Sequence, residues 1–476
     1  MRKTDFMLSL LLVLVAGVFA CCNTNNGTQG EEPDVPPTPL VEANKMVIYE
    51  CNERLFAEQD AFAAIEAYIP TLKEMGVNVL WLMPIHPRGE GDKSIGSPYC
   101  VRDFKGIDPA FGTMADLQSL VSTAHQNGMK VILDWIGNHT AWDNAWVSAH
   151  PDWYTGPQTG DEQQWADVTF LNYNKPAVCD AMQEAMLYWV DEADVDGYRC
   201  DYAHGVPLDF WTKANAEIFK RKKDAIMLAE TSDVRLCNAG FNLLYSWSYM
   251  YAIEGLYKGT GTFASLLSAS KSEYESTPEG CERMRYVTTH DETSQVAPAT
   301  VFRTAKGELS AFCLTIFMGG VPMIYSSQDL GYMNTINFFH YNLLDFKGEN
   351  TTRDALCELM SAYHATATLR GGEQSTGTLN SDVPYIEYEA GDKTLLVICN
   401  TSKSEQQVKL PMKHQGKVGT DLLSKQPCTL GGVTTLSEYE YRIYQLANQG
   451  SAPFHEVAVG GFEVACVPWI GYISVQ

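Results

Sequence analysis

The sequence is poor in basic residues. Lys and Arg together number 34, against 58 Asp and Glu in 476 residues, which gives a formal net charge of −24 at pH 7. Nucleic-acid binding depends on Lys and Arg to neutralise phosphates, and electrostatic docking to anionic lipid depends on them as well. The composition therefore argues against a nucleic-acid partner and suits a soluble protein with an uncharged ligand.

Several motifs that identify other classes of protein are missing. None of the 13 cysteines forms a C-x-x-C pair or stands at zinc-binding spacing with histidine. The chain contains neither G-x-S-x-G nor H-E-x-x-H, so nothing supports an esterase or a zinc protease. A few cysteines could pair in an exported protein, but their spacing indicates no connectivity. No organic cofactor is expected.

The apolar run at residues 6–20 is too short to span a membrane, which takes about 20 residues. A basic start precedes it, so the run predicts an export signal. The small residue before Cys21 resembles a bacterial lipobox, in which cleavage leaves a lipid-modified Cys21. The alternative is a plain secretory signal cleaved near Ala20.

We therefore expect residues 1–21 to be a lipoprotein signal peptide. Residues 22–44 are rich in proline and acids and are expected to form a flexible linker. Such a protein would be exported and attached to a bacterial membrane by its lipid anchor. The sequence leaves open whether the anchor lies on the periplasmic or the cell-surface side.

From residue 45 onward, short apolar runs alternate with helix-like segments. The runs predict strands at Met46–Tyr49, Val77–Met83, Met129–Asp134, Gly197–Cys200, Ala225–Ala229, Phe241–Ser246, Met284–Thr288 and Val321–Tyr325. Helices are expected between them, as at Asp60–Met75, Met114–Asn127, Ala177–Glu192 and Leu208–Lys223. Continuous apolar strands about 30 residues apart are typical of parallel strands buried on both faces. The pattern predicts an α/β protein with a (β/α)8 TIM barrel over residues 45–372; a doubly wound open sheet is the alternative.

The chain between the third and fourth predicted strands is about twice as long as one strand-helix unit, which takes about 30 residues. We therefore expect a short excursion at residues 140–175, and because βα loops build the active site of such barrels, it should shape a cleft. Residues 373–447 have strand-like runs and glycine-rich turns, which predict a C-terminal antiparallel β-sandwich. Residues 448–476 are a tail of unknown role.

Polar residues follow several of the predicted strands at their carboxyl ends. They are Asp134 at the end of the third strand and His139 after it, Arg199 in the fourth strand and Asp201 after it, Glu230 after the fifth, and His290 and Asp291 after the seventh. In a barrel these ends converge on one cleft. Taken alone, the polar residues of any one segment could equally cap a helix or form a salt bridge, without any catalytic role. Four segments in barrel order are a more specific signal.

Converging carboxylates of this kind suit glycoside cleavage. A retaining glycosidase uses an ionised carboxylate as nucleophile and a protonated carboxyl as acid/base, about 5–5.5 Å apart. The two roles require different pKa values. Arg199 stands two residues before Asp201, on the same face of a strand, and is expected to keep Asp201 ionised.

Together the segments resemble the α-amylase family, glycoside hydrolase family thirteen, over roughly residues 45–446. The four short regions of the family match Asp134–His139, Gly197–Asp201, Glu230 and His290-Asp291, with further matches at residues 76–84, 108–113 and 320–325. The resemblance implies a retaining hydrolase that cleaves α-1,4-glucosidic bonds in starch or maltooligosaccharides. A transglycosylase of the same fold is the alternative, and a non-catalytic starch-binding lipoprotein is a third hypothesis.

The resemblance also implies roles for single residues. Asp201 would be the nucleophile, Glu230 the general acid and then base, and Asp291 the stabiliser of the transition state. The sugar in the cleaved subsite would be bound by Tyr99, His139, Arg199 and His290. Asn138 matches a common calcium ligand, with Asp167 a possible second, although Asn138 could equally be a hydrogen-bonding residue at the strand end. Asp134 would be structural.

Aromatic residues near these regions could add further sugar contacts. Trp135, Trp142 and Trp165 could stack on sugars or belong to the core. The chain departs from the family pattern at Thr289, where Asn is common, and after the nucleophile at Tyr202-Ala-His204-Gly, where many α-amylases have Lys-His. The second departure weakens any assignment of subsite contacts and of calcium binding there.

Overall fold

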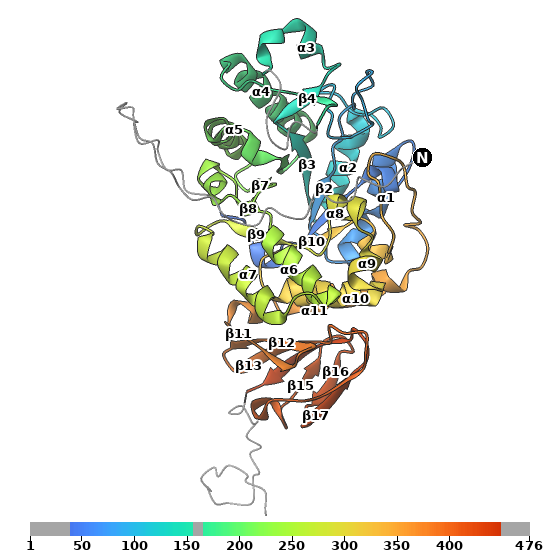
Figure 1. Cartoon of the computed structure of the whole chain (residues 1–476), viewed down its shortest axis with the longest axis vertical. Helices are drawn as coiled ribbons and strands as arrows, with labels where there is room; N and C mark the ends of the chain where they lie inside the picture. Colours follow the sequence, from blue (N-terminus) through green and yellow to red (C-terminus); the bar gives the residue numbers. More distant parts are fainter. Residues whose placement is uncertain (1–38, 156–164, 449–476) are drawn as a thin grey trace, which may run out of the picture. The chain divides into compact units, whose positions relative to one another are not determined.

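The computed structural model describes residues 39–155 and 165–448 (Figure 1). The predicted signal peptide with Cys21, most of the predicted linker, and residues 449–476 lie outside the described residues. Within the described ranges, no helix has both the length and the apolar character to cross a membrane.

Within these ranges, parallel strands close into an eight-stranded barrel. In chain order they are β1 (Ile48–Cys51), β2 (Val79–Leu82), β3 (Lys130–Ile136), β6 (Gly197–Asp201), β7 (Ile226–Ala229), β8 (Leu243–Leu244), β9 (Glu282–Arg285) and β10 (Val321–Tyr325). The ring closes where β1 pairs with β10, with Ile48 beside Met323. The prediction of a (β/α)8 barrel is confirmed, and the open doubly wound alternative is wrong.

Strand β9 begins earlier and ends earlier than the apolar pattern indicated, because two of its four residues are arginines buried by specific partners. Arg285 forms an ion pair with Glu273 (2.6 Å), and Arg283 donates to Tyr245 O (3.1 Å). The buried arginines hid the true start of this strand from a search for apolar runs.

Helices surround the barrel (Figure 1). They are α1 (Ala61–Glu74), α2 (Met114–Gln126), α4 (Pro176–Ala193), α5 (Leu208–Arg221), α6 (Trp247–Lys258), α7 (Phe263–Ser276), α8 (His290–Gln295), α9 (Pro298–Phe302), α10 (Ala305–Phe317) and α11 (Thr351–Ala365). The four helices predicted from the sequence correspond to α1, α2, α4 and α5. Helix α1, for example, buries Ile65, Ile69 and Leu72, an apolar stripe at helical spacing.

The predicted excursion is present between β3 and α4. It contains β4 (His139–Ala141), α3 (Ala145–Ala149) and β5 (Val168–Phe170). Strands β4 and β5 pair antiparallel, with His139 opposite Phe170. Ala141, Val168 and Phe170 form a small apolar cluster with Cys100, which fixes the excursion to the loop that follows β2.

The C-terminal segment forms antiparallel sheets, as predicted. Its strands are β11 (Glu373–Asn380), β12 (Val383–Ala390), β13 (Lys393–Cys399), β14 (Gln406–Lys409), β15 (Val418–Asp421), β16 (Gln426–Thr429), β17 (Val433–Leu436) and β18 (Tyr441–Ala447). In the described part of this segment, a sheet of order β11-β12-β13-β18-β15-β16 and a pair β14-β17 share a separate apolar cluster that includes Leu396, Val408 and Leu436.

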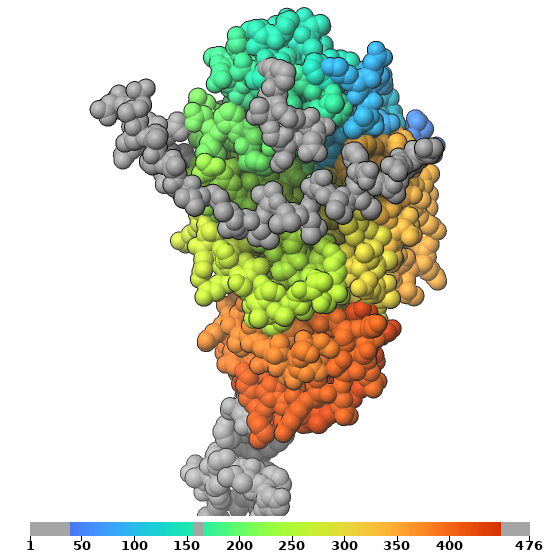
Figure 2. Space-filling view, viewed as in Figure 1, coloured from blue at the N-terminus to red at the C-terminus, as the bar shows by residue number. Residues whose placement is uncertain are grey.

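The C-terminal sheet contacts helix α10. Tyr388 on β12 donates a hydrogen bond to Phe317 O (2.8 Å), and Ser310 donates to Asn400 O (3.2 Å). Every residue from Gly307 to Phe317 is buried. In Figure 2 the orange to red residues of the C-terminal segment lie against the yellow and green residues.

One cysteine pair is bonded in the described residues. Cys237, before β8, forms a disulfide with Cys281, which directly precedes β9. The bond closes a stretch of 44 residues that includes α6 and α7. Cysteine spacing alone left this connectivity open.

Candidate active site

The carboxyl ends of neighbouring barrel strands bring the predicted polar residues together. Asp134 on β3 lies beside Arg199 on β6, and Ile136 lies beside Asp201. Glu230 follows β7 directly, and its backbone N donates to Cys200 O on β6 (3.0 Å). The register of the parallel strands therefore sets these side chains at one end of the barrel.

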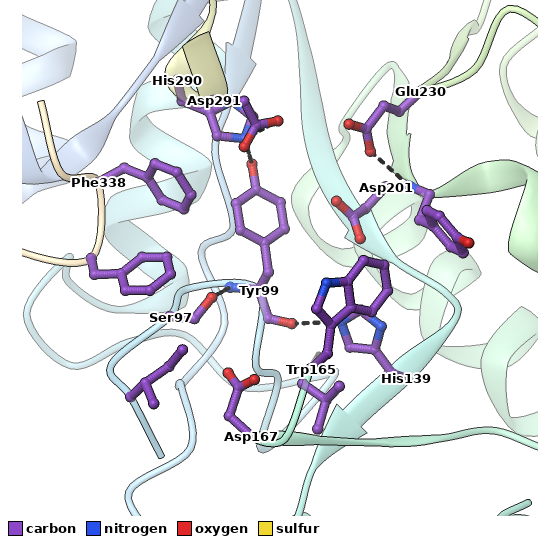
Figure 3. Close-up of a pocket in the computed structure, with 14 residues that line it drawn as sticks. Ser97, Tyr99, His139, Trp165, Asp167, Asp201, Glu230, His290, Asp291 and Phe338 are labelled. Carbon is purple, nitrogen blue, oxygen red and sulfur yellow. Dashed lines mark hydrogen bonds and ion pairs between the residues drawn. The ribbon is translucent and has the colours of Figure 1, made fainter. Parts of the chain in front are cut away.

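These residues surround a pocket of about 250 Å³ (Figure 3). Six predicted site residues line it: Tyr99, His139, Asp201, Glu230, His290 and Asp291. The other lining residues are Ile95, Ser97, Trp165, Asp167, Val168, Tyr202, Phe338 and Phe339. Figure 3 shows Asp201 and Glu230 on one side of the pocket and His290, Asp291 and Phe338 on the other.

Arg199 lies buried beneath the pocket and joins three carboxylates within the described residues. Its Nη1 lies 2.8 Å from Asp134 Oδ1 and 3.0 Å from Asp201 Oδ1, and its Nη2 lies 3.0 Å from Glu230 Oε2. The expected contact between Arg199 and Asp201 is confirmed. The contact with Glu230 means that one guanidinium sets the positions of both proposed reacting carboxyls.

The two carboxyls have different pKa values. Burial raises the pKa of Asp201 to about 6, although the positive charge of Arg199 opposes the rise. Burial also raises the pKa of Glu230, to about 8, against Arg199 and with a further contribution from the charge of Asp201. The larger rise at Glu230 favours a protonated Glu230 beside an ionised Asp201, which are the two protonation states that a retaining glycosidase requires.

The Glu230 carboxyl has a second fixed contact. Its Oε2 accepts a hydrogen bond from the backbone N of Tyr202 (2.8 Å) (Figure 3). Tyr202 has a left-handed backbone (φ 44°) at the start of the Tyr202-Ala-His204 departure from the family pattern. The segment that departs from the family pattern thus supplies a backbone N–H donor, that of Tyr202, to the Glu230 carboxyl.

Asp134 organises the floor of the site, in agreement with its predicted structural role. It is fully buried, and its Oδ2 accepts hydrogen bonds from Tyr99 Oη (3.1 Å) and Trp81 Nε1 (3.2 Å). Its other oxygen pairs with Arg199. Asp134 therefore holds both the tyrosine that lines the pocket and the arginine beneath it.

His290 is held between two acids. Its Nδ1 lies 2.5 Å from Glu50 Oε1, and its Nε2 lies 3.4 Å from Asp291 Oδ2. Burial opposes the charged imidazole, but the nearby Asp291 and Glu50 outweigh it and raise the pKa of His290 to about 10. His290 is therefore cationic at neutral pH and donates from Nε2 to Tyr99 Oη (2.8 Å).

His139 is neutral, in contrast to His290. Burial lowers the pKa of His139 to about 4. Its Nε2 donates to Tyr99 O (3.1 Å), and its ring packs edge-on against Trp165 at 5.7 Å between centroids. The neutral ring thus lines the pocket as a wall shared by the Tyr99 loop and the excursion.

The three tryptophans considered from the sequence have different environments. Trp135 is fully buried and belongs to the core. Trp165 lines the same pocket as Asp201 and Glu230. Trp142 is 40% exposed and lines a neighbouring depression instead.

Asn138, the predicted calcium ligand, lies between β3 and β4. Across residues 39–155 and 165–448, no three His, Cys, Asp or Glu side chains gather in a way that could hold a metal ion. Asn138 is buried beside His139, and His139 and Asp167 both line the pocket. Calcium takes about six to eight oxygen ligands, usually with several carboxylates. Calcium binding through Asn138 stays a prediction.

Sequence reasoning missed several residues of this site. Glu50 ends an apolar run, as the other site acids do, so the same signal could have found it. Phe338 and Phe339 enter the pocket from the long segment after β10, and Arg88 donates to Phe339 O (3.0 Å). Neither their spacing nor their composition indicated this position.

Comparison with known proteins agrees with this geometry. A family model described as the alpha amylase catalytic domain matches residues 62–167 and 162–362, well over half of the chain. The alpha-amylase MalA of Haloarcula japonica is 27% identical over 408 residues, which are 80% of this chain and 58% of MalA. The chain thus spans less than two thirds of that relative's length.

Two further relatives are informative. An alpha-1,4-glucan:maltose-1-phosphate maltosyltransferase of Rhodospirillum rubrum is 30% identical over 217 residues, which are 39% of this chain and 31% of the enzyme. The crystal structure of the maltogenic alpha-amylase AmyB from Thermotoga neapolitana superposes with a TM-score of 0.75 at 26% identity, covering 86% of this chain and all of AmyB. With the catalytic-domain match, the barrel and the converging acids all in agreement, the chain belongs to the alpha-amylase family.

Proposed function

We propose that the protein is a retaining glycoside hydrolase that cleaves α-1,4-glucosidic bonds in starch or maltooligosaccharides. The observation that carries this proposal is the pair Asp201 and Glu230, both held by Arg199, with pKa values of about 6 and about 8. The relatives named as amylases support an α-glucan as the substrate.

In the first step of this mechanism, the Asp201 carboxylate attacks the anomeric carbon of the sugar in the pocket. Glu230 donates its proton to the glycosidic oxygen, and the bond between that oxygen and the anomeric carbon breaks. The leaving chain departs with a free hydroxyl. The remaining sugar is held as a β-linked ester on Asp201.

In the second step, Glu230 acts as a base. Its carboxylate takes a proton from water as the water oxygen attacks the anomeric carbon and releases Asp201. Two inversions give a product with the original α configuration. The side chain of Asp291 is 42% exposed and is placed to bind sugar hydroxyls during both steps, with His290 Nε2 3.4 Å from its Oδ2.

A sugar hydroxyl could replace water in the second step, which would make the protein a transglycosylase. The partial match to a maltosyltransferase supports this second candidate. Product analysis on maltoheptaose distinguishes the two, because transfer produces chains longer than the substrate. A hydrolase produces only shorter chains. A non-catalytic starch-binding protein is disfavoured because all three acids are present.

The test of the proposed function is hydrolysis itself. We expect the purified protein to release reducing sugar from soluble starch and from maltoheptaose. Proton NMR of fresh product should detect the α-anomer before it mutarotates. A folded protein that releases no sugar from either substrate, or a β-anomer as first product, would overturn the proposal.

The activity should have a bell-shaped pH dependence. Below about pH 6 Asp201 becomes protonated and cannot attack, and above about pH 8 Glu230 loses the proton that it must donate. We therefore expect kcat/KM on a short maltooligosaccharide to be greatest near pH 7. Initial rates between pH 4 and pH 10, taken over times in which the protein stays folded, test this. A flat profile across that range contradicts the assignment.

We also propose that the enzyme is exported and attached to a membrane through a lipid on Cys21. The basic start, the apolar run and the residues before Cys21 support this. In a bacterial expression host, we expect the full-length protein in the membrane fraction. Cys21→Ser should move the activity to the soluble fraction. Equal membrane association of the two proteins would exclude a lipid on Cys21.

A further inference from the structure

A depression of about 240 Å³ lies next to the catalytic pocket. We call it the Trp142 pocket, and its polar and aromatic lining comprises Asp92, Lys93, Ser94, Trp142, Asp143 and Asp167. Nothing in the mechanism above uses it. An aromatic ring together with carboxylates, an ammonium and a hydroxyl is a lining that suits a neutral, hydroxyl-rich ligand.

The Trp142 pocket adjoins the catalytic pocket through shared walls. Asp167 lines both of them. The loop after β2 also reaches both, since Ser94 lines the Trp142 pocket and the next residue, Ile95, lines the catalytic pocket. A linear ligand bound in the catalytic pocket could therefore continue into the Trp142 pocket along this loop.

Trp142 has the features of a binding platform. It is 40% exposed, although a large aromatic side chain is normally buried. Its Nε1 donates to Ala166 O (3.1 Å), which fixes the plane of the ring. Lys93 Nζ lies 3.3 Å from the ring centroid, so the ring already attracts a partner. Because Lys93 is exposed and flexible, a ligand could displace it.

The walls of the Trp142 pocket are preformed. Asp143 Oδ2 accepts hydrogen bonds from the backbone N atoms of Glu90 (2.9 Å) and Gly91 (3.2 Å). Ser94 N donates to Gly91 O (2.8 Å), which closes the loop on itself. Binding would therefore require little ordering of the backbone, a cost that often limits affinity.

We infer that the Trp142 pocket binds a glucose unit of the same α-glucan chain, remote from the cleaved bond, with Trp142 stacking on the sugar. The pyranose ring would take the place of Lys93 on the indole face, and its hydroxyls would meet Asp92 and Asp167. This inference rests on the proposed function and deepens it. Sugar binding in the Trp142 pocket would make the enzyme selective for chains long enough to occupy both pockets.

The test compares the binding of a short and a long sugar by isothermal titration calorimetry. The parent protein carries Asp201→Asn so that neither maltose nor maltoheptaose is consumed. We expect Trp142→Ala in this parent to weaken maltoheptaose binding about tenfold, the loss of one good stacking contact. Maltose binding should change by less than about twofold, because maltose does not need the second pocket.

Two further variants guard against structural damage. Trp142→Phe keeps an aromatic face and should retain most of the affinity for maltoheptaose. Lys93→Ala uncovers the indole and should bind maltoheptaose at least as tightly as the parent. Thermal denaturation of each variant checks that it is folded.

The outcomes separate the two proposals. If the folded parent binds neither sugar, the proposed function fails and the Trp142 pocket fails with it. If the parent binds both sugars but Trp142→Ala leaves the affinity for maltoheptaose unchanged, or weakens both sugars equally, only the Trp142 inference is overturned.

Discussion

Replacing Asp201 by Asn is expected to lower kcat on maltoheptaose by at least about 10⁴-fold, the scale on which removal of a covalent nucleophile acts. The amide is close in size to the carboxylate and can still lie beside Arg199, but it cannot form the ester on which the two-step mechanism depends. Reducing-sugar release, measured at enzyme concentrations high enough to detect such a loss, tests this prediction.

Asp134 provides a matched control, because it contacts the same nitrogen of Arg199 as Asp201 does. Asp201 and Asp134 are each replaced by Ala in two separate variants, and sodium azide is added to each variant. Azide can attack the anomeric carbon from the space that the Asp201 side chain leaves, which would restore turnover and give a β-glycosyl azide. Asp134→Ala should be impaired without rescue. Rescue of Asp134→Ala and not of Asp201→Ala would reverse the assignment.

Replacing Glu230 by Gln is expected to lower kcat/KM on maltoheptaose by about 10²- to 10⁴-fold, the usual contribution of general acid–base catalysis. The glutamine can still accept a hydrogen bond from Tyr202 N, but it has no acidic proton for the leaving oxygen. The effect should depend on the leaving group. With α-maltosyl fluoride, whose fluoride needs little protonation, the first step should proceed far better.

The second step in Glu230→Gln should be slow, because no base activates water. We therefore expect one rapid equivalent of fluoride per enzyme molecule, followed by slow turnover, as the ester on Asp201 accumulates. Glu292→Gln is the control, since burial raises the pKa of this neighbouring carboxyl to about 7. Loss of the alkaline limb of the pH profile in Glu292→Gln, with the limb intact in Glu230→Gln, would assign the acid to Glu292.

Most of the barrel could be predicted because parallel strands buried on both faces are continuous apolar runs. Strand β9 was misplaced for the opposite reason. Its Arg283 and Arg285 are buried through contacts with Tyr245 and Glu273, and a search for apolar residues cannot foresee those partners. The pairing of Cys237 with Cys281 could not be predicted for the same reason, because it depends on which segments meet in space.

Site residues could be predicted where a residue of a catalytic type stands at the carboxyl end of a predicted strand. Asp201 is the last residue of β6 and Glu230 directly follows β7, so both acids stand at the end of the barrel where ligands bind. Glu50 acts on His290 across the barrel, from β1 to the start of α8, and only the closed ring reveals that they are neighbours. Phe338 lies in a segment without periodic structure, so no pattern could place it in the pocket.

Helix α10 has a consequence for how this protein can be divided. A helix on the outside of a barrel normally keeps one face in water, but Gly307–Phe317 are buried throughout, partly by the C-terminal sheet through Tyr388 and Asn400. A chain cut before β11 would uncover apolar helix surface and invite aggregation. The β strands that follow residue 372 are therefore not an interchangeable module, and shortened or chimeric variants of this chain should retain its own C-terminal sheet.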